Sequence, residues 1–402
     1  MEKSITSANE KVNVTNHYHI PDDIAFSILS KLPLKSLKRF ESVSKPWSLL
    51  FQNSYFMKIY RNHIIHGNHP DYDDASVIVR QMMPISYVDV ETDFYLMSDD
   101  RFENRVKMDI SLPSKELGQN LVIVGSISIN GILCVSSKAM EERKVVLWNP
   151  ATEEMKVIPR SPVECSFYRR AKPQIHAFGY DYVRNDYKLI RYVRFDVIRY
   201  EDDDMSWHKV SLEPLWEMYS LRSNSWRVLD VKMPTLIVPL CDVEMFRVYM
   251  DGMCHWWTQE ESHLEHCYDS HLVSFDLINE VFFTTPMPSD LYNEFSLEAV
   301  ECQLVLLNGH IALLQYYGEM TTFQISILGE LGVEKSWTKI FTVGLSSSVR
   351  RPIGAAKKGN IYFAKEDGEM VHFDLDTQMM EELGVKGWNC QMIIYKESLL
   401  SI

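Results

Sequence analysis

The hydrophobic positions at the start of the chain follow a helical period. Ile24, Ile28 and Leu32 stand four residues apart, which is typical of an amphipathic helix. Pro21 stands where a helix start favours a fixed φ, and Pro33 cannot continue the helix. The pattern therefore predicts a helix that begins near residue 21 and ends before residue 33.

Two more short helices are predicted in the next twenty residues, over 35–43 and over 44–51. Ser44 is a suitable N-cap for the second of them. Helices this short cannot bury their apolar faces alone, so a partner is expected to cover part of them. The apolar side chains on these faces are Leu37, Phe40, Val43, Trp47, Leu50 and Phe51.

From residue 75 onward the pattern changes to short β-rich runs separated by turn residues. One recurring unit is a turn pair ending in glycine directly before a strand. A second is a strand, a polar turn and another strand. The glycine pairs stand at 130–131, 251–252, 308–309 and 358–359, and the strand–turn–strand units at 145–159, 216–229, 272–286, 323–340 and 370–383.

The spacing of these units predicts a β-propeller. Equivalent positions at Trp148, Tyr219, Phe275, Ile327 and Phe373 are 71, 56, 52 and 46 residues apart, near the roughly 50 residues of a kelch-type blade. We interpret the acidic stretch 200–204, in the longest interval, as an inserted loop. Region 75–130 and a terminal strand at 391–395 can complete a sixth blade. A large β-sandwich is the alternative.

Composition and charge narrow the classes of partner. Of the 402 residues, 41 are Lys or Arg and 55 are Asp or Glu, for a net charge of −14, which argues against nucleic acid or an anionic membrane as partner. Residues 1–16 lack the apolar core of a signal peptide, and no apolar run approaches the roughly 20 residues of a membrane span. Seven scattered cysteines without a CxxC pair favour free thiols. We expect a location in the cytoplasm, the nucleus or both.

Candidate chemistry is sparse. The sequence contains no G-x-S-x-G, P-loop or G-x-G-x-x-G motif. Cys254 and His255 precede further histidines, but adjacent residues on a strand point to opposite faces, so a surface loop beside a buried strand is favoured over a zinc site. The basic pairs at 169–170 and 350–351 are too isolated to indicate nucleic acid. We expect no catalytic residue, no metal and no cofactor.

Residues 20–56 resemble the F-box. The matching motifs are Ile20-Pro21, Ile28-Leu29, Leu32-Pro33 and Val43-Ser44-Lys45-Pro46-Trp47. Residues 147–159 and 178–192 resemble the F-box-associated domain of plant F-box/kelch proteins, which include the S-locus pollen type. Glu41 and Ser42 depart from the common F-box pattern. This departure puts in doubt which adaptor the chain prefers.

The resemblance implies segregated α and β domains. It predicts a disordered N-terminus at 1–17, a three-helix F-box at 18–62, a linker at 63–75 and a propeller-like, kelch-type domain of about six blades at 76–402. It also implies a Skp-type adaptor on the F-box, a cullin scaffold bound indirectly, and a target protein of unknown identity on the second domain. The adaptor-binding residues it suggests are Pro21, Ile24, Ile28, Leu29, Leu32, Pro33, Leu37 and Trp47.

Some alternatives remain open at this stage. Phe40, Val43 and Trp47 can equally hold the three helices to each other. Substrate-binding residues are not assigned, although the loops at 160–174, 196–211 and 258–271 are candidates because binding sites often lie on loops. The leading function is a non-catalytic substrate receptor of a Skp–cullin–F-box (SCF) type ubiquitin ligase. The others are a propeller binding module that acts with the adaptor outside a ligase, and an enzyme with a propeller active site.

Overall fold

A computed structural model gives the fold, and it separates into two compact units, Met1–His63 and Ile64–Ile402. The residues that it describes are 20–32, 36–37, 39–40, 49–66, 75–84, 90–97, 104–108, 120–137, 144–164, 169–198, 211–231, 247–261, 268–287, 300–317, 322–333, 336–344, 349–355 and 360–402.

The first unit is helical, but its helices differ from the three predicted. The described residues contain two α-helices, α1 (Asp22–Leu29) and α3 (Ser54–His66), with a 3-10 turn, η2 (Leu50–Gln52), between them. Residues 36, 37, 39 and 40 are also helical, whereas most of the third predicted helix lies outside the described residues. Its end is the 3-10 turn, so the three-helix prediction is corrected.

Helix α3 was missed, and its cap explains where it begins. The Asn53 side-chain oxygen accepts a hydrogen bond from the backbone N–H of Phe56 at 3.0 Å, which satisfies one of the free donors of a first helical turn. The signal was present in the sequence as Asn53 followed by the apolar positions Phe56, Met57 and Tyr60. The helix runs into the predicted linker.

Aromatic packing holds the two helices of this unit together. Phe26 of α1 meets Phe56 of α3 edge to face, with ring centroids 5.6 Å apart, and Phe56 stacks on Tyr60 at 5.7 Å. Leu29 and Leu37 are buried in the same unit. Burial raises the pKa of the Tyr60 phenol, so it stays neutral.

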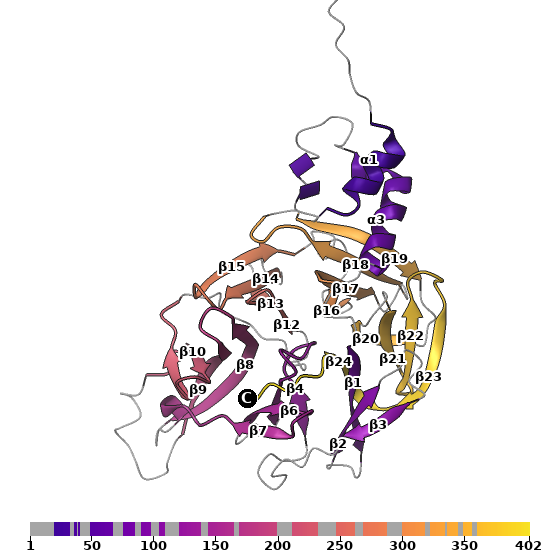
Figure 1. Ribbon diagram of the computed structural model, residues 1–402. Coiled ribbons are helices and arrows are strands. Elements are labelled where there is room, and N and C mark those ends of the chain that lie inside the picture. The colour runs from indigo at the N-terminus through magenta and orange to yellow at the C-terminus, as the bar shows by residue number, and fades with distance from the viewer. Residues whose placement is uncertain are drawn as a thin grey trace, which may run out of the picture. The chain divides into compact units, whose positions relative to one another are not determined.

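The second unit consists of six four-stranded antiparallel sheets arranged around a centre (Figure 1). The first sheet contains β24 (Trp388–Tyr395), β1 (Ser76–Pro84), β2 (Val90–Met97) and β3 (Arg105–Met108). The second contains β4 (Leu121–Ile123), β5 (Leu133–Ser137), β6 (Val145–Asn149) and β7 (Glu154–Val157). The third contains β8 (Arg169–Asp181), β9 (Asp186–Val197), β10 (Leu215–Ser220) and β11 (Ser225–Val228), preceded by a 3-10 turn, η3 (Pro162–Glu164). The fourth contains β12 (Arg247–Met250), β13 (Met253–Glu261), β14 (Tyr268–Asp276) and β15 (Val281–Pro286). The fifth contains β16 (Val300–Leu307), β17 (His310–Tyr317), β18 (Thr322–Leu328) and β19 (Trp337–Gly344). The sixth contains β20 (Val349–Ala355), β21 (Asn360–Lys365), β22 (Glu369–Asp374) and β23 (Met380–Lys386).

This arrangement is a six-bladed β-propeller, as the repeat spacing predicted, and not a β-sandwich. The sixth blade is the one expected from the diverged region after residue 75 together with the terminal strand. β24 pairs with β1 through partners such as Ile394 and Val77. It also contacts β20 and forms a bridge between Ile394 and Ile127. The last strand of the chain therefore closes the ring.

The glycine pairs form the tight hairpin turns that the sequence predicts. Asn130 and Gly131 have φ values of 51° and 81°, and the pairs at 251–252 and 308–309 are also left-handed. Two consecutive residues with positive φ are typical of a type I′ turn, which matches the twist of the two strands that it joins. The fourth pair, at 358–359, lies outside the described residues.

Three of the five polar turns, and the turn between β8 and β9, share a different device. An Asn or Asp at the end of one strand accepts a hydrogen bond from the backbone N–H two residues later, and a residue with positive φ stands near the end of the turn. The bonds are Asn149 to Ala151, Asp181 to Val183, Asp276 to Ile278 and Asp374 to Asp376. The equivalent positions used for the spacing, from Trp148 to Phe373, are all buried.

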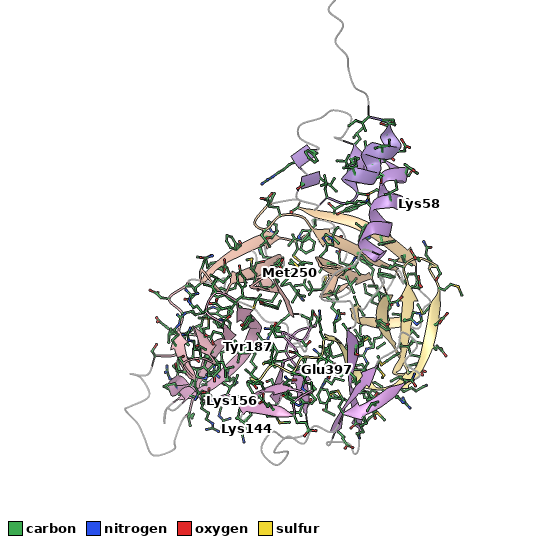
Figure 2. The ribbon with its side chains drawn as sticks, in the orientation of Figure 1. Lys58, Lys144, Lys156, Tyr187, Met250 and Glu397 are labelled. Atoms are coloured by element: carbon green, nitrogen blue, oxygen red, sulfur yellow. The ribbon has the colours of Figure 1, made fainter. Side chains whose placement is uncertain are left out.

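Adjacent blades pack through apolar clusters. Figure 2 draws the side chains on the ribbon. At one point the blades meet so closely that only glycine fits. A Cβ on Gly179 of β8 would lie 2.8 Å from both the Cys254 sulfur and the Tyr249 ring of the next blade. Blade packing therefore leaves no room for a side chain at this position.

Gly179→Ala will destabilise the propeller by about 1–3 kcal/mol, because overpacking forces neighbouring strands to shift. The free energy of unfolding, measured by denaturant titration, checks this. Gly344→Ala is the matched control, since a Cβ there meets nothing within 4 Å. If the two variants have equal free energies of unfolding, the neighbouring blade can shift to accommodate the added Cβ and the prediction is wrong.

Candidate functional site

The outer face of α1 carries an uncovered apolar stripe. Ile20, Ile24 and Ile28 are 58%, 50% and 56% exposed. The spacing of four places Ile24 and Ile28 on one side of α1, and Ile20 stands just before the helix begins. Three large exposed aliphatic side chains in a row are unusual on a surface that faces water alone. This stripe, which we call the isoleucine stripe, is the strongest candidate interaction site of the first unit.

The structure divides the predicted adaptor-binding residues into groups. Pro21, Ile24 and Ile28 are exposed, and Leu32 is half-buried. Leu29 and Leu37 are buried by the chain itself, so they form the core of the unit. Their role at an adaptor stays a prediction, as does that of the exposed residues. Pro33 and Trp47 lie outside the described residues, as does Val43, whereas Phe40 is half-buried.

A hollow in the same unit was not predicted. Phe26, Leu49 and Leu50, with Gln52 and Asn53, line an open hollow of about 340 Å³. Leu49 is largely exposed. The signal in the sequence was the run Leu49-Leu50-Phe51. The predicted helical face contains only Leu50 and Phe51, so Leu49 is left outside it. The unit therefore offers a second candidate contact surface, of mixed polarity, besides the isoleucine stripe.

On the propeller, the candidate loop at 160–174 is mostly ordered structure. The Ser161 hydroxyl donates a hydrogen bond of 2.5 Å to Glu217, and Arg191 donates to Glu164 at 2.6 Å and to Glu217 at 2.8 Å. The Arg191 guanidinium also lies 3.8 Å from the centre of the Trp226 ring. These contacts fix the first part of the loop, and residues 169–174 belong to β8.

The other two candidate loops, at 196–211 and 258–271, each join the second strand of a blade to the third. Residues 258–261 and 268–271 are paired parts of β13 and β14, with Glu261 opposite Tyr268. Residues 196–197 end β9, opposite the start of β8. The segments 199–210 and 262–267 lie outside the described residues, so the structure leaves the role of these loops as a prediction.

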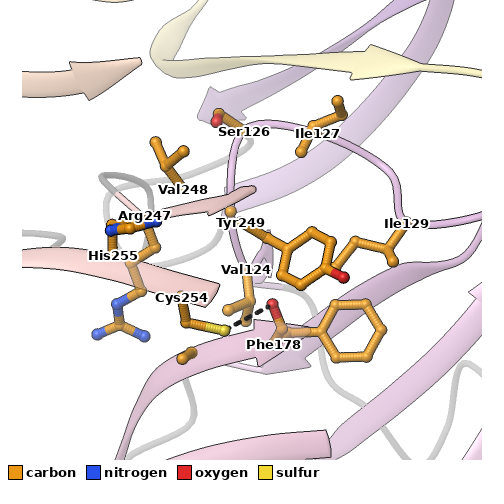
Figure 3. Close-up of a pocket in the computed structure, with 12 residues that line it drawn as sticks. Val124, Ser126, Ile127, Ile129, Phe178, Arg247, Val248, Tyr249, Cys254 and His255 are labelled. Atoms are coloured by element: carbon orange, nitrogen blue, oxygen red, sulfur yellow. Dashed lines mark hydrogen bonds between the residues drawn. The ribbon is translucent and has the colours of Figure 1, made fainter. Parts of the chain in front are cut away.

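The cysteine–histidine pair of β13 faces two different sides, as the spacing predicted (Figure 3). The Cys254 thiol donates to the Phe178 carbonyl at 3.6 Å, and burial raises its pKa, so it stays protonated. The His255 ring nitrogen Nδ1 lies 2.8 Å from the Ser274 hydroxyl, and burial lowers the pKa of the imidazole to about 3. Neither group is a charged nucleophile or base.

The hollow beside these two residues is small. It is lined by Val124, Ser126, Phe178, Tyr249 and others drawn in Figure 3, and it has room for about 10 Å³. That volume corresponds to about one water molecule. A small-molecule substrate therefore does not fit there.

Within the described ranges, no group of three or more His, Cys, Asp or Glu side chains is placed to hold a metal ion. No helix in the described part of the chain is both long and apolar enough to span a membrane.

Comparison with protein families agrees with both units. Residues 18–59 match the F-box domain, and residues 80–401 match the F-box associated beta propeller domain. The second match covers most of the chain and includes the closing strand β24.

Curated relatives match this chain over most of its length and most of theirs. The F-box protein CPR1 of Arabidopsis thaliana is 24% identical over 380 residues, covering 91% of this chain and 84% of the relative. A putative F-box/kelch-repeat protein of Arabidopsis thaliana is 24% identical over 336 residues, covering 82% and 72%. Among solved structures, TolB from Acinetobacter baumannii superposes with a TM-score of 0.47 at 11% identity, covering 85% of this chain and 72% of TolB.

Proposed function

The chain belongs to the family of F-box proteins with an F-box-associated β-propeller domain, and we propose that it is the substrate-recognition subunit of an SCF-type ubiquitin ligase. In this proposal the helical unit binds a Skp-type adaptor, which links the chain to a cullin scaffold. The propeller binds a target protein for ubiquitination. The chain acts in the cytoplasm, the nucleus or both.

The isoleucine stripe is the observation that supports adaptor binding best. Two of its three side chains, Ile24 and Ile28, are already held on α1, so little of their conformational entropy is lost when a partner covers them. Fully burying an aliphatic side chain of this size contributes roughly 1.5–3 kcal/mol. The hollow beside Leu49 adds a concave surface, lined by both apolar and polar side chains, in the same unit.

No residue of this chain needs to perform chemistry in this role. The ligase holds the target near a conjugating enzyme that carries ubiquitin. This replaces a bimolecular encounter by a nearly intramolecular one, at an effective concentration on the order of millimolar for short tethers. The protonated Cys254 and neutral His255 agree with a binding role for the propeller.

Ile24→Asp with Ile28→Asp will weaken adaptor binding by at least about tenfold, because each substitution replaces a buried apolar contact with a desolvated carboxylate. The test is co-expression of the full chain with a plant Skp-type adaptor, followed by size-exclusion chromatography and titration calorimetry. The cullin scaffold and the ubiquitination enzymes are then added. Recruitment of the cullin and transfer of ubiquitin indicate a ligase subunit, and their absence indicates a module that acts outside a ligase.

Val106→Asp with Val228→Asp is the matched control. Both valines are exposed on outer strands of the propeller, so the control makes the same chemical change away from the stripe and should leave adaptor binding unchanged. If the folded wild-type chain forms no complex with the adaptor, or if the control variant loses binding as strongly as the stripe variant, the adaptor assignment is wrong.

A further inference from the structure

One hairpin of the third blade extends past its neighbour. β8 and β9 pair as far as Arg169 opposite Val197, whereas β10 pairs with β9 only as far as Leu215 opposite Val193. Residues 169–172 and 194–197 therefore form a two-stranded extension of the blade, which we call the basic ribbon.

The basic ribbon has a charge opposite to that of the whole protein. It contains Arg169, Arg170, Lys172 and Arg194 but only one acid, Asp196, in a chain with a net charge of −14. In the sequence Arg169 and Arg170 stand as an isolated basic pair. The strand register brings Lys172 and Arg194 beside them, and these two cations stand directly opposite each other. Like charges in such a pair are destabilising.

The two faces of the ribbon differ. On one face Phe195 is buried and covered by the Arg169 guanidinium, 3.9 Å from the ring centre, and Arg169 donates to the Ser211 carbonyl at 2.9 Å. On the other face Arg170, Lys172, Arg194 and Asp196 are exposed. Lys172 pairs with Asp196. Among the described residues, neither Arg170 nor Arg194 has a hydrogen-bond or ion-pair partner, which leaves two guanidinium groups available.

We propose that the exposed face of the basic ribbon binds an extended acidic segment of the target protein. Arg170 and Arg194 are diagonal neighbours across the two strands, a position with a Cα separation of roughly 7–8 Å. Alternate side chains of an extended peptide repeat at roughly 6.8 Å on one face. Two acidic residues separated by one residue therefore match the two arginines, and each guanidinium can bind a carboxylate or a phosphate through two parallel hydrogen bonds.

The inference rests on the proposed function, since it names the chemistry of the target that the propeller would select. Charge complementarity carries it: an anionic segment relieves the repulsion between Lys172 and Arg194, and the local positive charge guides it to this site on an acidic protein. Anionic side chains come from two sources, aspartate or glutamate on one hand and phosphoserine on the other.

The test measures binding of fluorescent peptides to the full chain, in complex with the adaptor where that complex forms. The probes are a hexapeptide alternating aspartate and threonine, a threonine-glycine peptide with one phosphoserine, and a hexapeptide alternating lysine and threonine. We expect one or both acidic probes to bind, the lysine probe not to bind, and binding to weaken as salt rises from roughly 50 to 300 mM. Arg170→Glu with Arg194→Glu will reduce the affinity for the acidic probe at least about tenfold.

Arg105→Glu with Arg350→Glu is the matched control, because it changes the net charge equally at two other exposed arginines of the propeller and should bind like the wild type. Arg170→Gln with Arg194→Gln removes the charge without reversing it and should give an intermediate loss. A polyuridine RNA is tested as a further probe. The inference is wrong if the ribbon variant and the control bind the acidic probes equally. It is also wrong if no acidic probe binds the wild type, or if the RNA is the only probe that binds. Adaptor binding is read separately, so failure of the ribbon and failure of the ligase role can be told apart.

Discussion

A chain that ends at Gly387 will not form a stable propeller, because it lacks the strand that closes the ring. β24 contributes five buried apolar side chains, which are Cys390, Met392, Ile393, Ile394 and Tyr395. At roughly 1.5–3 kcal/mol for each large apolar side chain, their loss costs on the order of 10 kcal/mol, which is comparable to the total stability of a typical domain.

Polar contacts of β24 add to this cost. The Gln391 side-chain amide donates to the carbonyls of Ile123 at 2.7 Å and Gly125 at 3.0 Å. The fully buried Arg80 donates to the Asn389 carbonyl at 2.7 Å. Without β24 these groups lose partners in a site away from water, where an unsatisfied polar group is expensive. The first blade also exposes the edge of β1, a template for aggregation.

A chain that ends at Tyr395 is the matched control. It keeps β24 and loses only 396–402, whose main contact with the propeller is Asn149, which donates to the carbonyls of Ser398 at 3.0 Å and Leu400 at 2.7 Å. We expect this shorter chain to fold with a modestly lower Tm, and the chain ending at Gly387 to be insoluble or to melt without cooperativity. Circular dichroism melts and soluble yield check both. A cooperative melt of the Gly387 chain near the wild-type Tm would contradict closure by β24.

The propeller was predictable because its repeats are local. Turn pairs such as Asn130-Gly131, and the Asn or Asp that opens several of the polar turns, act within a few residues, so they can be read from the sequence. The first blade was visible only in outline, since its strands come from both ends of the chain, and pairs such as Val77 with Ile394 leave no local pattern.

Features that depend on strand register or on burial were not predictable. Lys172 and Arg194 are 22 positions apart in the sequence and meet only because of the pairing of β8 with β9. The helical period predicted an apolar stripe on α1, but it did not show that Leu29 faces the interior while Ile24 and Ile28 face outward. Asn53 carried a readable cap signal that was overlooked.

Asp181→Ala will be among the most destabilising single substitutions in the propeller, at about 3 kcal/mol, because it removes the main partner of a buried cation. Asp181 is fully buried and accepts hydrogen bonds of 2.8 Å from both Lys188 and Arg184. Lys188 is also buried and donates to the Leu277 carbonyl of the next blade at 2.7 Å. Once Asp181 is gone, the nearest remaining carboxylate is Glu280, 3.6 Å from the ammonium. The free energy of unfolding at neutral pH measures the loss.

Two further variants separate the charge effect from lost packing. Arg184→Ala removes a cation that is 50% exposed, so it should cost less than about 1 kcal/mol. Asp181→Ala with Lys188→Met removes the stranded charge as well, so it should be more stable than Asp181→Ala alone. If the double variant is no more stable, the cost comes from the lost turn hydrogen bonds to Val183 and Arg184 and not from a buried unpaired lysine.

The same carboxylate gives the stability a defined pH dependence. Burial by itself would raise the pKa of Asp181, but the hydrogen bonds from Lys188 and Arg184 outweigh it and lower the pKa to about 2. An unfolded aspartate titrates near pH 3.9, so the folded state holds its proton more weakly and the stabilisation is fully present above about pH 4. It is lost as the pH falls from about 4 towards 2. Urea titrations across this range should therefore show the gap between the wild type and Asp181→Ala narrowing with acid. A gap that stays constant down to pH 2 would mean that the ion pair with Lys188 does not hold the proton off Asp181.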